Sequence, residues 1–144
     1  MSAQSGRIYR DSSFYMDLDS GELKTKYFLV LAAPPATDIV IRLLTSRYAS
    51  LRPEDPPCHH GDPYPGFFLG IPGQVLKQKT WLDLRKLDDL DPWDFERDLT
   101  QGRISEVQTI PVDQFKAALA CAASADDTTT RQEQLIRDVL AGLG

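Results

Sequence analysis

The sequence has no apolar run long enough to cross a membrane, because a membrane-spanning helix needs about 20 such residues in succession. Its opening residues, MSAQSGRIYRDSS, also lack the apolar core of a secretory signal peptide. From these two absences we expect a cytoplasmic protein with no membrane partner.

Cysteine and histidine are scarce, since the chain contains only two of each. Cys58 and Cys121 are too few for a disulfide framework, so reduced thiols are the simpler interpretation. The segment Cys58-His59-His60-Gly61-Asp62 offers adjacent candidate ligands, but zinc takes about four ligands that usually come as two spaced pairs. The only other cysteine, Cys121, falls on a helix face that we expect in the core. We therefore predict a polar loop here, with no metal and no cofactor.

Excess positive charge is missing as well: 21 Asp and Glu residues outnumber 16 Lys and Arg residues, which gives a net charge of −5. A protein that binds nucleic acid through its phosphates normally carries a basic patch. The acidic residues are concentrated between Asp83 and Asp98. If RNA binds, we expect it on the more basic N-terminal part, which contains Arg7, Arg10, Lys24, Lys26, Arg42, Arg47 and Arg52.

What the sequence does contain is a series of short strand-like segments. Apolar, aromatic and β-branched residues predict strands within 6–18, 27–32, 39–45, 66–71, 80–85 and 103–110. Residues 27–32 are apolar without alternation, which predicts a strand buried on both faces. The short connection to the next strand indicates an antiparallel hairpin. Residues 51–65, which are rich in proline, are expected to form a long loop.

Helices are expected after the strands. Asp91 and Pro92 are typical of an N-cap and a first helical position, and Gly102 marks the end of that helix. Pro111 begins a second helix with apolar residues along one face. Thr130 and Glu133 predict a capping box for a C-terminal helix.

These elements predict an α+β fold in which a small, strongly bent antiparallel barrel carries two or three helices. The barrel and its helices are expected in residues 1–123 and a polar break in residues 124–130. The C-terminal helix is expected in residues 131–144.

A possible site lies where two apolar runs end. Lys26 precedes one run, and Thr45 and Ser46 end the next. The start of one strand of an antiparallel hairpin faces the end of the other, so this arrangement brings a cation near two hydroxyls. The alternative is a strand-end lysine in solvent beside a Thr-Ser turn.

Several short segments also carry a family resemblance. Among them are KTKYFLVLA (24–32) and IVIRLLTSR (39–47), with further segments at 6–9, 14–19, 80–85 and 102–104. Their order resembles the MazF/PemK (Kid) family of plasmid-maintenance and growth-inhibiting toxins over residues 6–122. The family has a basic residue before the first of these strands and a Thr-Ser-like motif at the end of the second.

This resemblance implies an SH3-like barrel, a homodimer, an antitoxin-like partner and metal-independent cleavage of single-stranded RNA. Lys26 corresponds to the family's arginine, Thr45 or Ser46 to its hydroxyl, and Asp83 to an acidic residue that some members use. An ammonium cannot make the two-pronged contact of a guanidinium, so Lys26 departs from the pattern and cleavage is expected to be weakened or lost. Tyr27 stands where the family has proline.

Three functions remain open from the sequence. The first is a toxin-like endoribonuclease. The second is a non-catalytic SH3-like module that binds a protein or peptide. The third is a structural or regulatory subunit that docks through residues 131–143. The residues expected to contact RNA or a partner are Tyr27, Arg47, Tyr64, Phe67 and Trp81.

Overall fold

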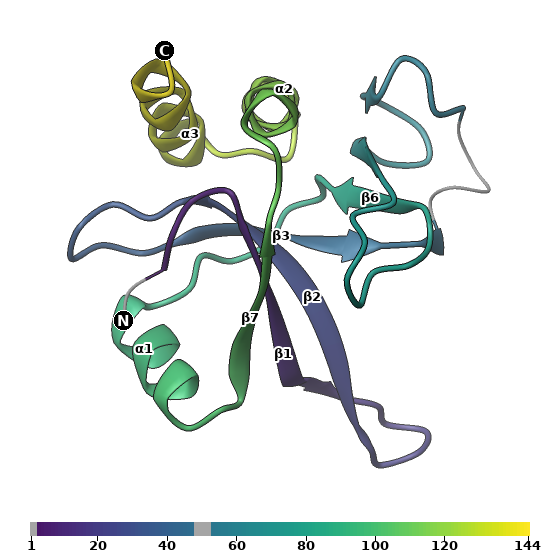
Figure 1. The fold of residues 1–144 in the computed structure, drawn as a ribbon, viewed down its shortest axis with the longest axis vertical. Helices are drawn as coiled ribbons and strands as arrows, with labels where there is room; N and C mark the ends of the chain where they lie inside the picture. The colour runs from purple at the N-terminus through teal and green to yellow at the C-terminus, as the bar shows by residue number, and fades with distance from the viewer. Residues whose placement is uncertain (1–2, 48–52) are drawn as a thin grey trace.

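The computed structural model describes residues 3–47 and 53–144, which form one seven-stranded antiparallel sheet and three helices (Figure 1). The strand order is β4-β5-β6-β3-β2-β1-β7. The strands are β1 (Arg7–Met16), β2 (Leu23–Ala32), β3 (Val40–Thr45), β4 (Cys58–His59), β5 (Gly66–Gly70), β6 (Thr80–Asp83) and β7 (Ile104–Thr109). The helices are α1 (Pro92–Thr100), α2 (Val112–Ala123) and α3 (Thr130–Gly142). None of the described helices is long and apolar enough to span a membrane.

The sheet is open, with β4 and β7 as its two edges. The α+β class and the antiparallel pairing of β2 with β3 are therefore confirmed, whereas the expected closed barrel is not observed. A two-residue β4 has too few backbone groups to close a ladder with a distant strand. Its other close neighbour is α2, to which Cys58 is covalently joined.

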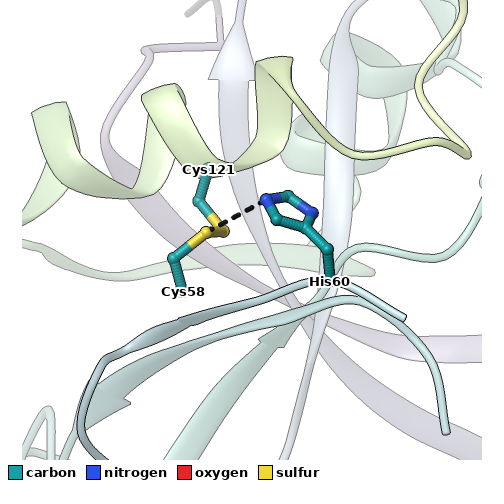
Figure 2. A group of neighbouring side chains, drawn as sticks. All are labelled: Cys58, His60 and Cys121. Carbon is teal, nitrogen blue, oxygen red and sulfur yellow. Dashed lines mark hydrogen bonds between the residues drawn. A yellow bond between two sulfur atoms is a disulfide. The ribbon is translucent and has the colours of Figure 1, made fainter. Parts of the chain in front are cut away.

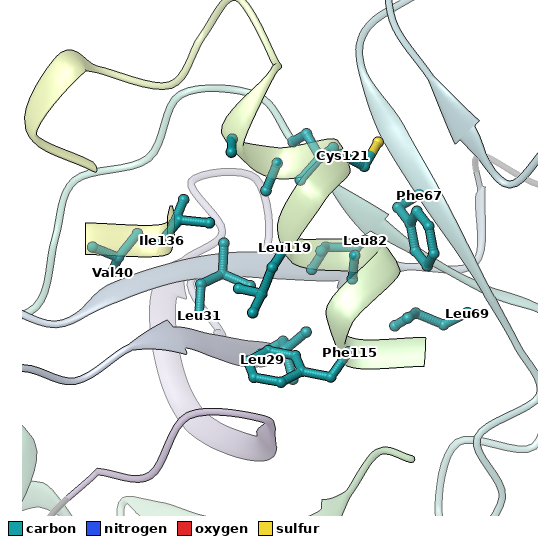
Figure 3. Packing of buried hydrophobic residues seen from close by; sticks show 14 of the residues in the cluster. Leu29, Leu31, Val40, Phe67, Leu69, Leu82, Phe115, Leu119, Cys121 and Ile136 are labelled. Atoms are coloured by element: carbon teal, nitrogen blue, oxygen red, sulfur yellow. The ribbon is translucent and has the colours of Figure 1, made fainter. Parts of the chain in front are cut away.

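The strand β2 is buried on both faces, as its unbroken apolar run predicts. On one face, Leu29 and Leu31 pack beneath α2 and α3 with Leu119 and Ile136 (Figure 3). On the other face, Phe28 and Val30 belong to a second apolar cluster beside α1, which also contains Tyr9, Ile39, Ile41, Phe95 and Ile104. The helices α2 and α3 thus cover one side of the sheet and α1 covers part of the other (Figure 1).

Local signals predicted the start of two helices. The Asp91 side chain accepts hydrogen bonds from the backbone N–H groups of Trp93, at 2.7 Å, and Asp94, at 3.3 Å. Gly102 follows α1 with a φ of 83°, a conformation that glycine adopts without steric cost. The helix α2 begins directly after Pro111, as expected.

The capping box of α3 lies one residue earlier than expected. Thr129 is the N-cap, its hydroxyl accepts from Gln132 N–H at 3.1 Å, and Gln132 Oε1 accepts from Thr129 N–H at 3.0 Å. The sequence offers two overlapping pairs of the right type and spacing, Thr129 with Gln132 and Thr130 with Glu133. The first pair forms because Gln132 also accepts a hydrogen bond from a residue of the sheet.

The donor of this hydrogen bond is a buried cation on β3. Arg42 is completely buried and donates to Gln132 Oε1 at 3.1 Å and to Ile41 O at 2.8 Å. Gln132 Nε2 in turn donates to Asp89 Oδ1 at 2.8 Å. Burial lowers the pKa of Arg42, although Asp89 and more distant carboxylates partly oppose this. Arg42 therefore does not contribute to a basic surface, and the apolar stripe of α3 packs on its own chain through Ile136.

Candidate functional site

The most chemically distinctive hollow opens where β2 and β3 diverge. Phe28 to Ala32 pair with β3, but the earlier part of β2 pairs only with β1. Leu44 and Thr45 pair instead with Leu82 and Trp81 of β6. Extending the pairing of Phe28 with Leu43 by two residues places Lys26 across from Thr45. The space left between the diverging strands is a cleft of about 380 Å³, called the Lys26 cleft below.

The Lys26 cleft is lined by cations and hydroxyls. Its cationic side chains are Lys26, Arg47 and Lys77, and its hydroxyl side chains belong to Thr25, Tyr27, Thr45, Ser46 and Thr80. No carboxylate is among the described residues that line it. In a chain with a net charge of −5, this is a local concentration of positive charge.

Local contacts hold several of these groups in place. The Lys26 Nζ lies 5.8 Å from the centroid of the Tyr15 ring, within the range of a cation–π contact. Thr45 Oγ1 accepts a hydrogen bond from the backbone N–H of Arg47 at 3.2 Å, which shapes the turn at the end of β3. The structure thus brings Lys26, Thr45 and Ser46 to one cleft, the juxtaposition expected from the sequence.

Asp83, the fourth expected catalytic residue, is placed elsewhere. It does not line the Lys26 cleft but belongs to a smaller hollow with Leu43 and Arg85. Arg85 Nε lies 3.1 Å from each carboxylate oxygen of Asp83, and its Nη2 lies 2.6 Å from Oδ2. This hydrogen bonding raises the pKa of Arg85. The Arg85 guanidinium also lies 3.9 Å from the Tyr64 ring, so Tyr64 belongs to this second group of residues.

The aromatic residues expected to form the wall of a groove are mostly inside the protein. Phe67 is buried in the core beneath α2, and Trp81 is completely buried beside His59 and Phe68. Trp81 and the core residue Leu82 point to opposite faces of β6, and both are buried because both faces are covered. Of the expected aromatic contact residues, only Tyr27 lines the Lys26 cleft.

Sequence reasoning missed Lys77. It lies in the connection between β5 and β6, about fifty residues after Lys26 along the chain. Gly73 and Leu76 exchange backbone hydrogen bonds at 3.0 and 2.8 Å, forming a tight turn that folds this connection back toward β3. The dipeptide Pro72-Gly73 is typical of a turn, but it does not indicate which strand the next residues approach.

The two cysteines form a disulfide, so the expectation of reduced thiols is wrong for this structure (Figure 2). Cys58 on β4 and Cys121 on α2 have Cα atoms 5.7 Å apart, within the range a disulfide requires. Cys121 is nevertheless buried in the apolar core, as its helical position predicted. The two residues are 63 positions apart in the sequence, so no local sequence pattern indicates that they pair.

The fold and the Lys26 cleft define an open α+β sheet protein with a cleft in which positive charge is concentrated. Comparison with protein-family models, with curated proteins and with solved structures gives no match for this chain.

Proposed function

We propose that this chain is a toxin-like, metal-independent endoribonuclease of a toxin–antitoxin system, which acts on single-stranded RNA in the cytoplasm. The observation that carries the proposal is the gathering of three cations and several hydroxyls, with no carboxylate, among the described residues that line one cleft. In this proposal the open sheet is a divergent form of the family's SH3-like barrel. An antitoxin-like protein inhibits the enzyme by covering the cleft.

In this proposal a phosphate of the RNA backbone lies between Lys26 and Arg47, two of the cations that line the cleft. Arg47 lines the same cleft and carries a planar guanidinium, the group that makes two-pronged contacts to phosphate oxygens and that Lys26 lacks. The hydroxyls of Thr45 and Ser46 donate to the same group. The half-buried Tyr27 offers a ring on which an unpaired base stacks, a contact typical of single-stranded RNA recognition.

The proposed reaction is a transesterification that needs no metal. The 2′-oxygen forms a bond to the adjacent phosphorus, and the bond from phosphorus to the 5′-oxygen breaks. Water takes the proton from the 2′-hydroxyl and returns one to the 5′-oxygen, so the products are a cyclic phosphate and a 5′-hydroxyl. The cleft contributes by stabilising the negative charge that builds up on the phosphorane. Since no carboxylate or imidazole is among the described residues lining the cleft, we expect slow cleavage.

Cleavage of a mixed-sequence single-stranded RNA in the presence of a chelator tests the proposal. We expect Lys26→Ala and Arg47→Ala each to lower the cleavage rate about ten- to hundredfold, because each removes a charge-assisted hydrogen bond worth about 1.5–3 kcal/mol. Lys79→Ala is the matched control, since Lys79 lies outside the cleft and pairs with Glu54. It should cleave at the wild-type rate.

Three results would contradict the nuclease. RNA binding without any cyclic-phosphate product would leave only a binding role for the cleft. Equal losses in Lys79→Ala and Lys26→Ala would show that overall charge, and not the cleft, matters. Absence of both binding and cleavage would leave the non-catalytic interaction module as the better function.

One observation supports the homodimer that the family resemblance implies. The tip of the β1–β2 hairpin extends away from the rest of the chain (Figure 1) and exposes Tyr15, Met16, Leu18 and Leu23. Leu18 is 94% exposed. Exposed apolar patches mark interaction sites, and a patch at a hairpin tip can pair with its own copy across a twofold axis. We propose that the hairpin-tip patch joins two copies of the chain into this homodimer.

Light scattering coupled to size-exclusion chromatography tests the dimer. The wild-type chain should elute with twice its 16.1 kDa mass. Leu18→Glu combined with Leu23→Glu should give monomers, because opposed carboxylates would be brought into an apolar contact. Val112→Glu, on the exposed face of α2, is the matched control and should stay dimeric. A monomeric wild type would rule out this use of the patch.

A further inference from the structure

Two sulfur atoms and an imidazole nitrogen converge where the edge strand β4 meets α2 (Figure 2). Cys58 Sγ, His60 Nε2 and Cys121 Sγ all lie within 4.8 Å of one another. His60 Nε2 is 3.3 Å from Cys58 Sγ, so the ring nitrogen and not a ring carbon faces the sulfurs. These three residues are called the sulfur–imidazole cluster below.

We propose that reduction of the Cys58–Cys121 disulfide converts the sulfur–imidazole cluster into a binding site for Zn²⁺. The chain thus has two mutually exclusive states at this position. In one, Cys58 and Cys121 are joined by a disulfide bond, and in the other, both thiolates bind a metal ion. The proposal does not depend on the endoribonuclease, because none of the three residues lines the Lys26 cleft.

The positions of the donor atoms are close to those that zinc requires. Tetrahedral zinc with Zn–S of about 2.3 Å and Zn–N of about 2.1 Å holds sulfur and nitrogen ligands about 3.6 Å apart. The observed sulfur–nitrogen distance of 3.3 Å is within a few tenths of an ångström of that value. Once the S–S bond is broken, the two sulfurs have to separate to about 3.8 Å, the spacing of two thiolates on one zinc ion.

The surroundings provide both a rigid anchor and an entry path. Cys121 is buried on α2 and packs in the main core, which fixes one ligand. Cys58 is half-buried and His60 is exposed, so an ion reaches the sulfurs from the side of the imidazole. Gly61, with a φ of 91°, turns the chain directly after His60. Of the described residues, only Cys58 and His59 pair this segment with β5, so few ladder hydrogen bonds oppose its movement when the sulfurs part.

The donor set indicates which ion binds. Thiolate and imidazole ligands favour zinc and softer ions, whereas magnesium and calcium prefer oxygen ligands, and none of the three cluster residues is a carboxylate. Two thiolates neutralise the charge of Zn²⁺, so a bound ion leaves no net charge beside the core. Three protein ligands leave the fourth tetrahedral position open to water.

The exchange between the two states balances with a dithiol as reductant. The dithiol breaks the S–S bond, gives two electrons and two protons to Cys58 and Cys121, and becomes a disulfide itself. Zinc then displaces the two thiol protons into solvent and forms two Zn–S bonds, while neutral His60 donates its Nε2 lone pair. Zinc affinity is therefore expected to fall as the pH is lowered.

Metal titration of the full chain tests the proposal, with Co²⁺ as a visible probe and Zn²⁺ as competitor. We expect the reduced chain to bind one Co²⁺ with a thiolate-to-cobalt absorption band, which one equivalent of Zn²⁺ removes. The oxidised chain should bind neither ion at the cluster. His60→Ala should weaken binding by about tenfold or more, since even partners outside the ligand shell contribute that much. His59→Ala, whose Nε2 lies 3.0 Å from Pro53 O, is the matched control and should bind within about twofold of wild type.

Other outcomes overturn the site. Equal Zn²⁺ affinity in the His60→Ala and His59→Ala variants would show that the His60 imidazole is not a ligand. If the reduced wild type binds Zn²⁺ no more tightly than the Cys58→Ser variant does, the thiolates are not ligands. If the reduced chain loses its far-ultraviolet circular dichroism, the proposal requires Zn²⁺ to restore it, and failure to do so also counts against it.

Discussion

Replacing both Cys58 and Cys121 by serine is expected to lower the free energy of unfolding of the oxidised chain by about 4 kcal/mol. The disulfide joins residues 63 positions apart, and a cross-link over a loop of that length restricts the unfolded chain by about this amount. The bond also attaches the edge of the sheet at β4 to α2, and β4 has only two residues of ladder to hold it otherwise. Urea denaturation of oxidised wild type and of the double variant measures the difference.

Wild type treated with a metal-free reductant provides the control. It should unfold at the same or a higher urea concentration than the double serine variant, because both lack the covalent link and Cys121→Ser also places a hydroxyl in the apolar core. Adding Zn²⁺ should stabilise the reduced wild type and leave the double variant unchanged. A difference below about 1 kcal/mol between oxidised wild type and the double variant would show that the link adds little to this fold.

Phe95→Ala is expected to destabilise the chain by about 3–5 kcal/mol, the usual cost of deleting a large buried aromatic side chain. Phe95 is almost completely buried and meets the Tyr9 ring edge-on, with ring centroids 5.0 Å apart. It also lies 6.4 Å from the ring of Phe28. Among the described residues, the cluster beside α1 contains seven buried apolar residues, so it has few side chains with which to fill the resulting cavity.

Trp93→Ala is the matched control for this prediction. Trp93 lies on the same helix, two residues earlier, and is 79% exposed, so its loss should change the stability by less than about 0.5 kcal/mol. Thermal or urea unfolding of both variants provides the comparison. Similar losses in the two variants would mean that α1 contributes through its helical propensity and not through the Phe95 contact.

The candidate site was predictable only in part. Lys26, Thr45 and Ser46 could be placed together because they end adjacent segments of one hairpin, and a hairpin has a single antiparallel register that buries both of its apolar faces. Arg47 follows Ser46 directly and shares the cleft for the same reason. Lys77 could not be found in this way, because its approach depends on how a later connection folds back.

Asp83 illustrates the opposite case. It lies on a strand that the sequence located correctly, and its neighbour Trp81 does pair with Thr45. Asp83 is nevertheless engaged by Arg85, two residues further along, and lies outside the Lys26 cleft. Strand assignment predicted the face of Asp83, but the ion pair and the second hollow depend on the connection after β6, which carries Arg85, Lys86 and Leu87.

The amino-acid sequence by itself determined the features that depend on a few neighbouring residues. Apolar runs without alternation specified a doubly buried β2, and Asp91, Pro92 and Pro111 specified where α1 and α2 begin. Steric limits on φ and ψ, side-chain capping and periodicity act within one or two turns of chain, so their signals are legible locally.

Only the tertiary structure decided which distant groups meet. It left the sheet open, paired Cys58 with Cys121, and selected Thr129 over Thr130 as N-cap through the contact of Gln132 with buried Arg42. Each outcome depends on the packing of segments more than forty residues apart. The free energy of such contacts comes from surface that two segments bury against each other. The sequence of one segment alone therefore does not predict the contact.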